Sequence, residues 1–145
     1  DGCFEAMGVT GSVYINSQLP SSSGLGSSAA VTVATLCAIN DEFGKKKTRE
    51  DIANMAFEIE KTVQKGRASP TDTTVSSYGG IVFISGGERR RLPPQNMHLV
   101  IGDSLVSHST AKMVEQVSEL RKKHPDIVDP VMDAIEVSAL LPSTT

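Results

Sequence analysis

Residues 20–30, PSSSGLGSSAA, limit the possible folds of this chain more than any other segment. They follow an alternating stretch over 9–18, which predicts a half-buried strand, and they precede a helix predicted over 29–39. That helix is apolar nearly all round, which is typical of a buried helix. Gly24 and Gly26 can adopt a positive φ and let the backbone approach a ligand closely. The unpaired N–H groups where such a helix begins favour an anion, phosphate above all.

The same segment also fits a Gly/Ser turn with a serine cap and no ligand. It is not a Walker A loop, because no lysine follows the glycines, and G-L-G lacks the third glycine of a dinucleotide-binding loop. No serine has glycine both two residues before and two residues after it, which excludes the nucleophile elbow of hydrolases. A phosphate loop of another class and an unliganded turn are both left open at this point.

Two carboxylates carry the other chemical signals. Glu60 lies on the shoulder of the apolar stripe of a helix that is predicted to start at a Thr48–Asp51 capping box and to run to about Gln64. A carboxylate on the core side of a helix needs a partner, either a metal ion or a buried lysine, and the alternative is a rim side chain that reaches solvent. Asp72 lies in ASPTDTTVSSYGG, at the end of a loop that glycine and proline predict over 65–72, and an aspartate in such a loop usually bonds its own backbone.

The rest of the chain alternates strands and helices, which is typical of an α/β or α+β fold. Short buried strands are expected at 81–84 and 97–101, on either side of a turn and linker-like stretch over 86–96. Two further helices are expected to turn apolar faces inward, the first over 111–123 with Ser109 or Thr110 as its cap, the second with Asp129 as its cap and Pro130 in its first turn.

Composition narrows the function classes. The chain has 145 residues, enough for one domain or for a fragment of a larger protein. Its net charge of −3 and the lack of a long apolar run predict neither a nucleic-acid partner nor a membrane partner. Cys3 and Cys37 form no pairing framework and are expected to be small core residues in a reducing compartment. The three scattered histidines argue against zinc.

Three segments together, PSSSGLGSSAA, FEIEKTVQ and ASPTDTTVSSYGG, resemble the GHMP kinase superfamily, which includes galactokinase, homoserine kinase, mevalonate kinase and phosphomevalonate kinase. E-x-x-V-Q followed by A-S-P-T-D-T is most similar to the mevalonate kinases of the archaeal branch, and the likeness continues through 102–135. The resemblance implies the GHMP kinase fold. Residues 1–96 would then be part of the ATP-binding N-terminal domain, which is similar to domain 2 of ribosomal protein S5, and 97–145 the beginning of the C-terminal domain.

The resemblance also implies roles for individual residues. In the family the glycine loop wraps the ATP phosphates, a serine and a glutamate ligate Mg²⁺, and an aspartate beside the substrate hydroxyl is the proposed base. These roles fall on Ser28 and Glu60 for the metal and on Asp72 for the base, with Ser69 near the substrate. Mg²⁺ prefers hard oxygen ligands, and phosphoryl transfer needs mainly positioning and charge neutralisation. The implied phosphate-binding residues are Pro20, Ser21, Ser22, Ser23, Gly24, Leu25, Gly26, Ser27, Ser28, Ala29 and Ala30.

The implied function is ATP- and Mg²⁺-dependent phosphorylation of the 5-hydroxyl of mevalonate, in isoprenoid synthesis, by a cytoplasmic enzyme. Members of the family are often homodimers, so the resemblance implies a homodimer as one expected assembly. Two alternatives stay open. One is an inert truncated piece of a GHMP kinase, and the other is a GHMP kinase for another small alcohol such as phosphomevalonate, homoserine or a sugar.

The sequence departs from the family pattern in two respects. The stretch Val63-Gln-Lys-Gly-Arg67 has one residue more before its glycine than the V-Q-G of archaeal relatives, which affects the path of the loop before Asp72. The family's active-site lysine motif would precede Asp1, and its C-terminal Gly-rich motif would follow Thr145. The chain is therefore expected to be the middle of a kinase and to be inactive alone.

Overall fold

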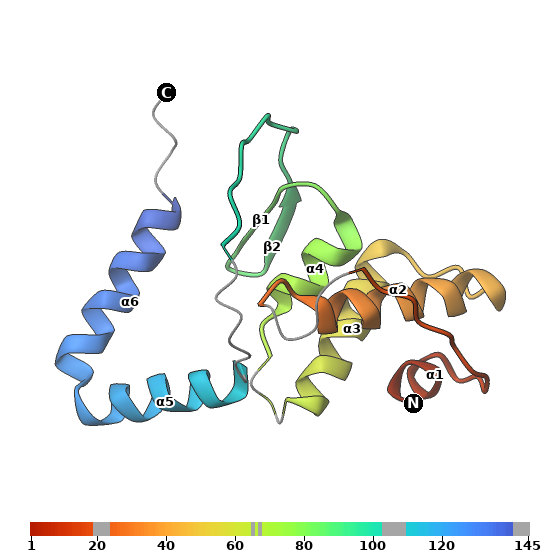
Figure 1. Cartoon of the computed structure of the whole chain (residues 1–145), viewed down its shortest axis with the longest axis horizontal. Helices are drawn as coiled ribbons and strands as arrows, with labels where there is room; N and C mark the ends of the chain where they lie inside the picture. The colour runs from red at the N-terminus through yellow and green to blue at the C-terminus, as the bar shows by residue number, and fades with distance from the viewer. Residues whose placement is uncertain (19–23, 65, 67, 103–109, 141–145) are drawn as a thin grey trace. The chain divides into compact units, whose positions relative to one another are not determined.

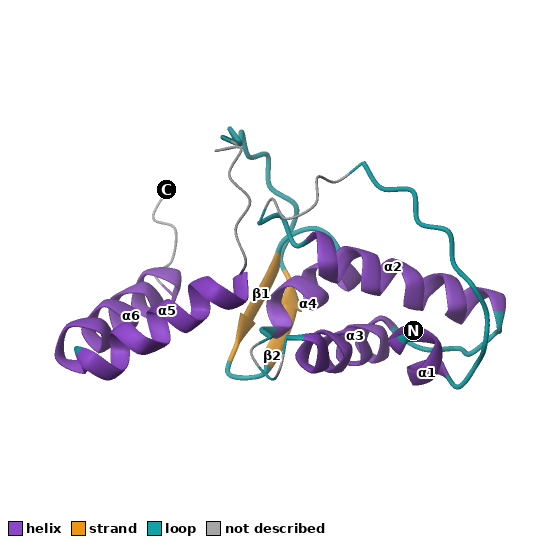
Figure 2. Cartoon of the chain, turned by 60° about the horizontal axis from the view of Figure 1, so that its bottom comes forward, coloured by secondary structure: helices purple, strands orange, loops and turns teal. Residues whose placement is uncertain are grey.

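The chain divides into two compact units, Asp1–Ser107 and His108–Thr145. Within the described part, it consists of helices and one small antiparallel sheet, which Figure 2 distinguishes by colour, in agreement with the predicted α+β class. No helix there is long and apolar enough to cross a membrane. The computed structural model describes residues 1–18, 24–64, 66, 68–102 and 110–140, as Figure 1 shows.

Three helices form the centre of the first unit, and a short one packs at their side. Helices α2 (Ser27–Glu42) and α3 (Arg49–Val63) lie side by side in Figures 1 and 2. Helix α4 (Pro70–Tyr78) packs against both of them, and α1 (Gly2–Met7) packs against α2 and α3. The buried apolar core consists of Met7, Val33, Leu36, Ile39, Ile52 and Ala56.

Helices α2 and α3 confirm the sequence prediction in position. The predicted capping box is present at the start of α3, because the Thr48 side chain accepts from the Asp51 N–H at 3.1 Å and Asp51 accepts from the Thr48 N–H at 2.8 Å. The burial of α2 on all sides is a wrong prediction. Cys37 and its neighbour Ala38 are exposed, since among the described residues only one face of α2 is covered.

Helix α4 begins inside the loop predicted over 65–72 and continues to Tyr78, a helix that the sequence did not predict. The Ser69 side chain caps it by accepting from the Thr71 N–H at 3.2 Å, and Pro70 occupies the first helical turn. The composition did not predict this helix, because serine, threonine and valine have weak helix propensity and the segment has no clear apolar period. Packing decides the conformation instead, since Thr73 and Thr74 are both buried at 1% and 0% exposure.

A β-hairpin replaces the predicted strand and linker. Strand β1 (Val82–Ser85) confirms the predicted strand nearly in place, and β2 (Glu88–Arg91) pairs with it antiparallel inside the stretch predicted as a linker. The two-residue connection is Gly86-Gly87, with φ of 56° and 87°. Positive φ at both positions is what the favoured tight hairpin turn requires, so the glycine pair was an available signal for β2.

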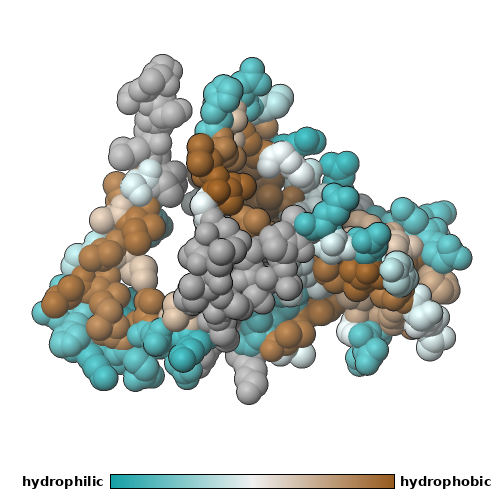
Figure 3. Space-filling model, viewed as in Figure 1, coloured by the Kyte–Doolittle hydropathy of each residue, from teal (hydrophilic) through white to brown (hydrophobic). Residues whose placement is uncertain are grey.

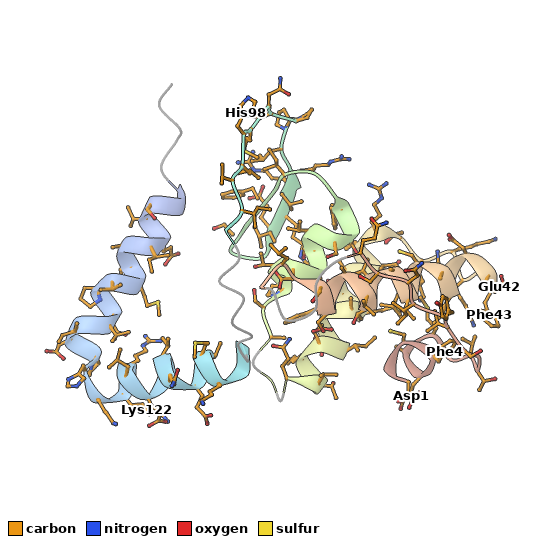
Figure 4. All side chains as sticks on the ribbon, viewed as in Figure 1. Asp1, Phe4, Glu42, Phe43, His98 and Lys122 are labelled. Carbon is orange, nitrogen blue, oxygen red and sulfur yellow. The ribbon has the colours of Figure 1, made fainter. Side chains whose placement is uncertain are left out.

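The other two predicted strands are wrong. Residues 9–18 and 97–101 form no strand, because no segment among the described residues pairs with them, and a lone extended segment has no ladder of hydrogen bonds. Most of the apolar side chains of these stretches are exposed, Val100 completely. A Cβ atom at Gly11 would lie 2.8 Å from Cε1 of Phe4, which is labelled in Figure 4, so glycine lets this stretch pass close to α1.

The second unit contains α5 (Thr110–Lys123) and α6 (Pro125–Leu140), which pack against each other. The start of α6 was predicted wrongly, because Pro125 occupies its first turn and Pro130 lies inside it. The predicted inward faces are exposed as well, since two helices cover only part of each other. Figure 3 shows apolar surface along both helices. The exposed apolar residues include Met113, Val114, Val117, Leu120, Val131 and Ile135.

Candidate active site

The site is built around the start of α2, where the glycine segment ends. Gly26 precedes the helix with φ of 66° and ψ of 24°, and Gly24 has φ of 75°, so both adopt the left-handed conformation that favours glycine. The first intrahelical bond runs from the Ala30 N–H to the Gly26 carbonyl at 3.0 Å, which leaves the N–H groups before Ala30 without intrahelical partners. Unpaired N–H groups at a helix start are typical of an anion site, and phosphate binding here stays a prediction. Residues 20–23, also predicted to bind phosphate, lie outside the described residues.

Glu60, on α3, contacts this helix start through a hydrogen bond with Ser28. The Ser28 hydroxyl donates to both carboxylate oxygens of Glu60 at 3.0 Å, although the two residues are 32 positions apart in sequence. Glu60 is only 5% exposed, whereas Ser28 is exposed. The alternative of a rim glutamate that reaches solvent is therefore wrong. No lysine or arginine of the described residues forms an ion pair with Glu60.

The donor set around Glu60 fits the chemistry of Mg²⁺. Adjacent ligands of an octahedral ion with bonds of about 2.0–2.1 Å lie roughly 2.9 Å apart, close to the separation of the Ser28 and Glu60 oxygens. Both donors are hard oxygen atoms, and the exposed serine leaves one side open for water and phosphate. A buried carboxylate without a basic partner among the described residues also favours a cation beside it.

Asp72 approaches the same helix start from α4. It is the third residue of that helix, in the first turn, where the helix dipole favours a carboxylate. A Cβ atom at Gly26 would lie 3.4 Å from Cγ and 3.5 Å from Oδ2 of Asp72. The loop predicted around Asp72 is thus a helix start, and it brings the exposed carboxylate against the end of the glycine segment.

Ser69 is engaged locally as the cap of α4. Besides accepting from the Thr71 N–H, its Oγ atom lies 2.9 Å from the Thr71 hydroxyl. The side chain is exposed and two residues before Asp72, so it lies near the candidate base in sequence. Its predicted contact with a substrate stays a prediction.

The charge of Glu60 affects the pKa of the Cys3 thiol. Cys3 packs against α2, with Sγ 3.8 Å from the Thr32 carbonyl oxygen. Burial raises the pKa of this thiol, the N-terminal ammonium lowers it, and the charge of Glu60 raises it. The predicted core position is confirmed in part for Cys3, which is half-buried, and is wrong for the exposed Cys37.

Sequence reasoning missed two residues of the site. The buried Thr32 hydroxyl donates to Oε1 of Glu60 at 2.8 Å, and the Gln64 amide donates to Oε2 at 3.1 Å. A signal was available, because Thr32 and Gln64 each lie four residues after a predicted metal ligand, Ser28 and Glu60 respectively. Side chains four apart share one helix face, so both residues could have been placed beside the ligands.

Comparisons with known proteins identify the family of this chain. Residues 2–80 match the family described as the GHMP kinases N terminal domain, and this range contains every described residue of the site. The mevalonate kinase of Archaeoglobus fulgidus is 44% identical over 128 residues, 88% of this chain and 43% of the relative. The mevalonate kinase of Thermococcus sibiricus is 39% identical over 88% of the chain and 38% of the relative. That of Methanothermobacter thermautotrophicus is 36% identical over 86% of the chain and 41% of the relative.

The chain spans about two fifths of the length of these relatives. Their similarity covers most of the chain, whereas the N-terminal domain match ends at residue 80. Since that match includes more than half of the 145 residues, the chain belongs to the GHMP kinase family.

Proposed function

We propose that the protein carrying this chain transfers the γ-phosphoryl group of ATP to the 5-hydroxyl of mevalonate. The observation that carries the proposal is the convergence of Ser28, Glu60 and Asp72, from three different helices, on the start of α2. This set contains oxygen ligands for a cation and a carboxylate for a hydroxyl proton, beside backbone that suits phosphate. The choice of mevalonate rests on relatives named mevalonate kinase at 36–44% identity.

The start of α2 would bind the ATP phosphates mainly through backbone N–H groups. Gly26 keeps this surface free of a side chain where phosphate approaches. Ser28 and Glu60 would hold Mg²⁺, which neutralises phosphate charge when it is bound. The remaining phosphate contacts proposed for this loop belong to residues 20–23.

Asp72 would orient the substrate hydroxyl and take its proton. The hydroxyl oxygen forms a bond to the γ-phosphorus while the bond to the bridging oxygen of ADP breaks, and the hydroxyl proton passes to the carboxylate. In a loose transition state the proton moves late, so orientation matters at least as much as basicity. The exposed position of Asp72 beside Gly26 suits contact with both substrates.

Measurement of ADP release by the whole protein, with a panel of alcohols, tests the proposal. We expect ADP release that depends on mevalonate and Mg²⁺, with phosphorus NMR identifying a phosphate monoester at the 5-position. Faster turnover of phosphomevalonate, homoserine or galactose would transfer the assignment to that substrate. A folded whole protein that turns over none of them would contradict the proposed kinase activity. The 145-residue chain, assayed alongside, is expected to be inactive.

We also propose that residues 97–145 begin the family's C-terminal domain and that the enzyme is cytoplasmic. The end of the N-terminal domain match at residue 80 supports a domain change after that point. Limited proteolysis of the whole protein tests the division, with first cleavage expected between residues 92 and 110. First cleavage inside α2 or α3 would contradict it.

A further inference from the structure

The carboxylate of Glu60 receives hydrogen bonds from two directions. Ser28 approaches both of its oxygens from the exposed start of α2. Thr32 donates to Oε1 from one turn deeper in α2, where its side chain is 9% exposed. Gln64 donates to Oε2 from the cap position directly after the last residue of α3. The two oxygens are therefore held from different sides, one from α2 and the other from the end of α3.

The number of lone pairs on the Glu60 carboxylate shows which of them can still bind a cation. A carboxylate offers about four lone-pair directions, two on each oxygen. Thr32 uses one direction on Oε1 and Gln64 one on Oε2, so one direction on each oxygen is left, and the single proton of the Ser28 hydroxyl is shared between these two. The Ser28 hydroxyl is at the surface and can rotate its proton toward a phosphate oxygen, which frees these directions for a cation.

We infer that Thr32 and Gln64 are positioning residues, which orient Glu60 so that its free lone pairs face Ser28 and a bound cation. Neither residue would touch the cation or the reacting atoms. The inference rests on the proposed function, because it takes Ser28 and Glu60 as the Mg²⁺ ligands. Loss of a partner that orients a metal ligand typically weakens metal binding about 10–100-fold.

A purely structural role for these two residues makes a different prediction. Hydrogen bonds that only satisfy a buried carboxylate would affect the free energy of unfolding and leave metal binding in the folded protein unchanged. The distinguishing measurement is therefore the affinity for the cation itself. Mn²⁺ is a suitable probe because it accepts the same hard oxygen ligands and is detected by electron paramagnetic resonance.

The experiment compares Thr32→Val with Thr32→Ser in the whole protein. Valine keeps the shape and removes the hydroxyl, whereas serine keeps the hydroxyl. Thr35→Val is the matched control, because Thr35 is similarly buried on α2 and does not bond Glu60 among the described contacts. Gln64→Met removes the second donor with little change in size. Each variant is titrated with Mn²⁺ at saturating ATP, and mevalonate KM and kcat are measured in parallel.

We expect Thr32→Val and Gln64→Met to weaken Mn²⁺ binding about 10–100-fold, with the loss expressed in kcat rather than in the KM for mevalonate. Thr32→Ser and Thr35→Val should stay within about threefold of wild type, well below that loss. Wild-type Mn²⁺ affinity in either donor-removing variant that folds overturns the inference. If Thr32→Val does not fold, Gln64→Met and Thr32→Ser decide alone.

Measurements on the wild-type protein distinguish a failure of the proposed function from a failure of this inference. A wild-type protein that binds no Mn²⁺ in the presence of ATP contradicts the metal assignment before any variant is compared. A wild-type protein that binds Mn²⁺ and ATP but does not phosphorylate mevalonate contradicts only the substrate, and the effect of Thr32 and Gln64 on Mn²⁺ affinity is then still measurable.

Discussion

Glu60 shows how far the surroundings of one side chain constrain its role. A glutamate at 5% exposure must be compensated, and three neutral donors compensate this one. Neutral donors stabilise a carboxylate without cancelling its charge. The negative charge therefore remains available to a cation that enters from the side of Ser28.

Glu60→Gln tests the charge at constant shape. We expect a higher Mg²⁺ concentration for half-maximal rate and a lower kcat, with little change in the KM for mevalonate, because only the metal ligand loses its charge. Initial rates against free Mg²⁺ measure this. Glu58→Gln, an exposed change on the same helix, is the control. Wild-type Mg²⁺ dependence in Glu60→Gln would remove this residue from the metal site.

Thr74 allows a test of stability within α4. Its hydroxyl is buried with no hydrogen-bond partner among the described residues, whereas the Thr73 hydroxyl donates to the Pro70 carbonyl at 3.2 Å. We expect Thr74→Val to raise the free energy of unfolding by about 1 kcal/mol and Thr73→Val to lower it by about as much. Urea unfolding of both variants measures the difference. A loss of stability in Thr74→Val would mean that its hydroxyl has a partner.

Single residues were predictable where local chemistry fixes them. The shoulder position of Glu60 followed from its angle to the apolar stripe, and burial confirms it. Val63 fits the same stripe and is nevertheless 70% exposed, because it is the last residue of α3, where no described element covers it. Periodicity therefore gives the face of a helix but not how far along the helix that face is covered.

Gly26 matters at the level of the element, since it sets both the start of α2 and the space beside Asp72. In Gly26→Val the left-handed backbone costs about 1–2 kcal/mol, and the new side chain occupies the space between the helix start and the carboxylate. We expect ATP binding to be lost with only a modest loss of stability. Calorimetric titration with ATP and thermal unfolding measure the two effects.

Gly44→Ala separates the cost of a left-handed backbone from the effect of filling the space beside Asp72. Gly44 lies just beyond the other end of α2 with φ of 57°, and a Cβ atom there would meet nothing within 4 Å. The variant should lose a similar amount of stability and bind ATP as the wild type does. Unchanged ATP affinity in Gly26→Val would contradict the phosphate-loop assignment.

The capping box of α3 gives a pH dependence with a definite sign. The Thr48 backbone N–H and then the Thr48 hydroxyl lower the pKa of Asp51 in the folded chain. A lowered folded pKa means that the stabilisation is present above the unfolded value of about 3.9 and is lost as the pH falls through the folded value. The gap in unfolding midpoint between wild type and Asp51→Asn should therefore be largest at neutral pH.

Urea unfolding from neutral pH down to about pH 3, which lies below the unfolded value, measures that gap. Glu50→Gln changes a neighbouring carboxylate in the same turn and is the control for general charge effects. A gap for Asp51→Asn that is constant with pH, or that grows in acid, would rule out the capping contribution.

Elements with strong local signals were predicted, and elements held by packing were not. α2 has a long apolar run and α3 has an apolar stripe after a capping box, and both were placed correctly. α4 has weak helix formers and is held by burial of its threonines against α2 and α3. The failed strands at 9–18 and 97–101 show the reverse case, because a pattern of side chains does not supply a pairing partner.

At the level of the whole molecule, the site depends on contacts between distant parts of the sequence. Glu60 lies 32 positions after Ser28 in the sequence. Asp72 lies beside Gly26, although α2 and α3 separate the two residues in the sequence. No propensity or periodicity predicts such contacts, and the resemblance to a kinase family was what grouped these residues. In the structure, Ser28 and Glu60 are joined by a hydrogen bond and Asp72 lies beside Gly26, while their roles in catalysis stay predictions.

Asp72→Asn tests whether this arrangement performs phosphoryl transfer or only binds its substrates. Asparagine keeps the shape and the hydrogen-bonding reach beside Gly26 but cannot take the hydroxyl proton. We expect kcat of the whole enzyme to fall by about 10²-fold or more, within the usual range for a general base.

Binding and chemistry must separate in this variant if Asp72 acts only in the transition state. Dissociation constants for ATP and mevalonate, measured by calorimetry, should stay near wild type, because the start of α2 and the Ser28–Glu60 pair are unchanged. A near-normal kcat would overturn the base assignment. Weaker substrate binding together with a near-normal kcat would instead assign Asp72 to substrate binding, since an interaction already formed in the ground state contributes nothing to the chemical step.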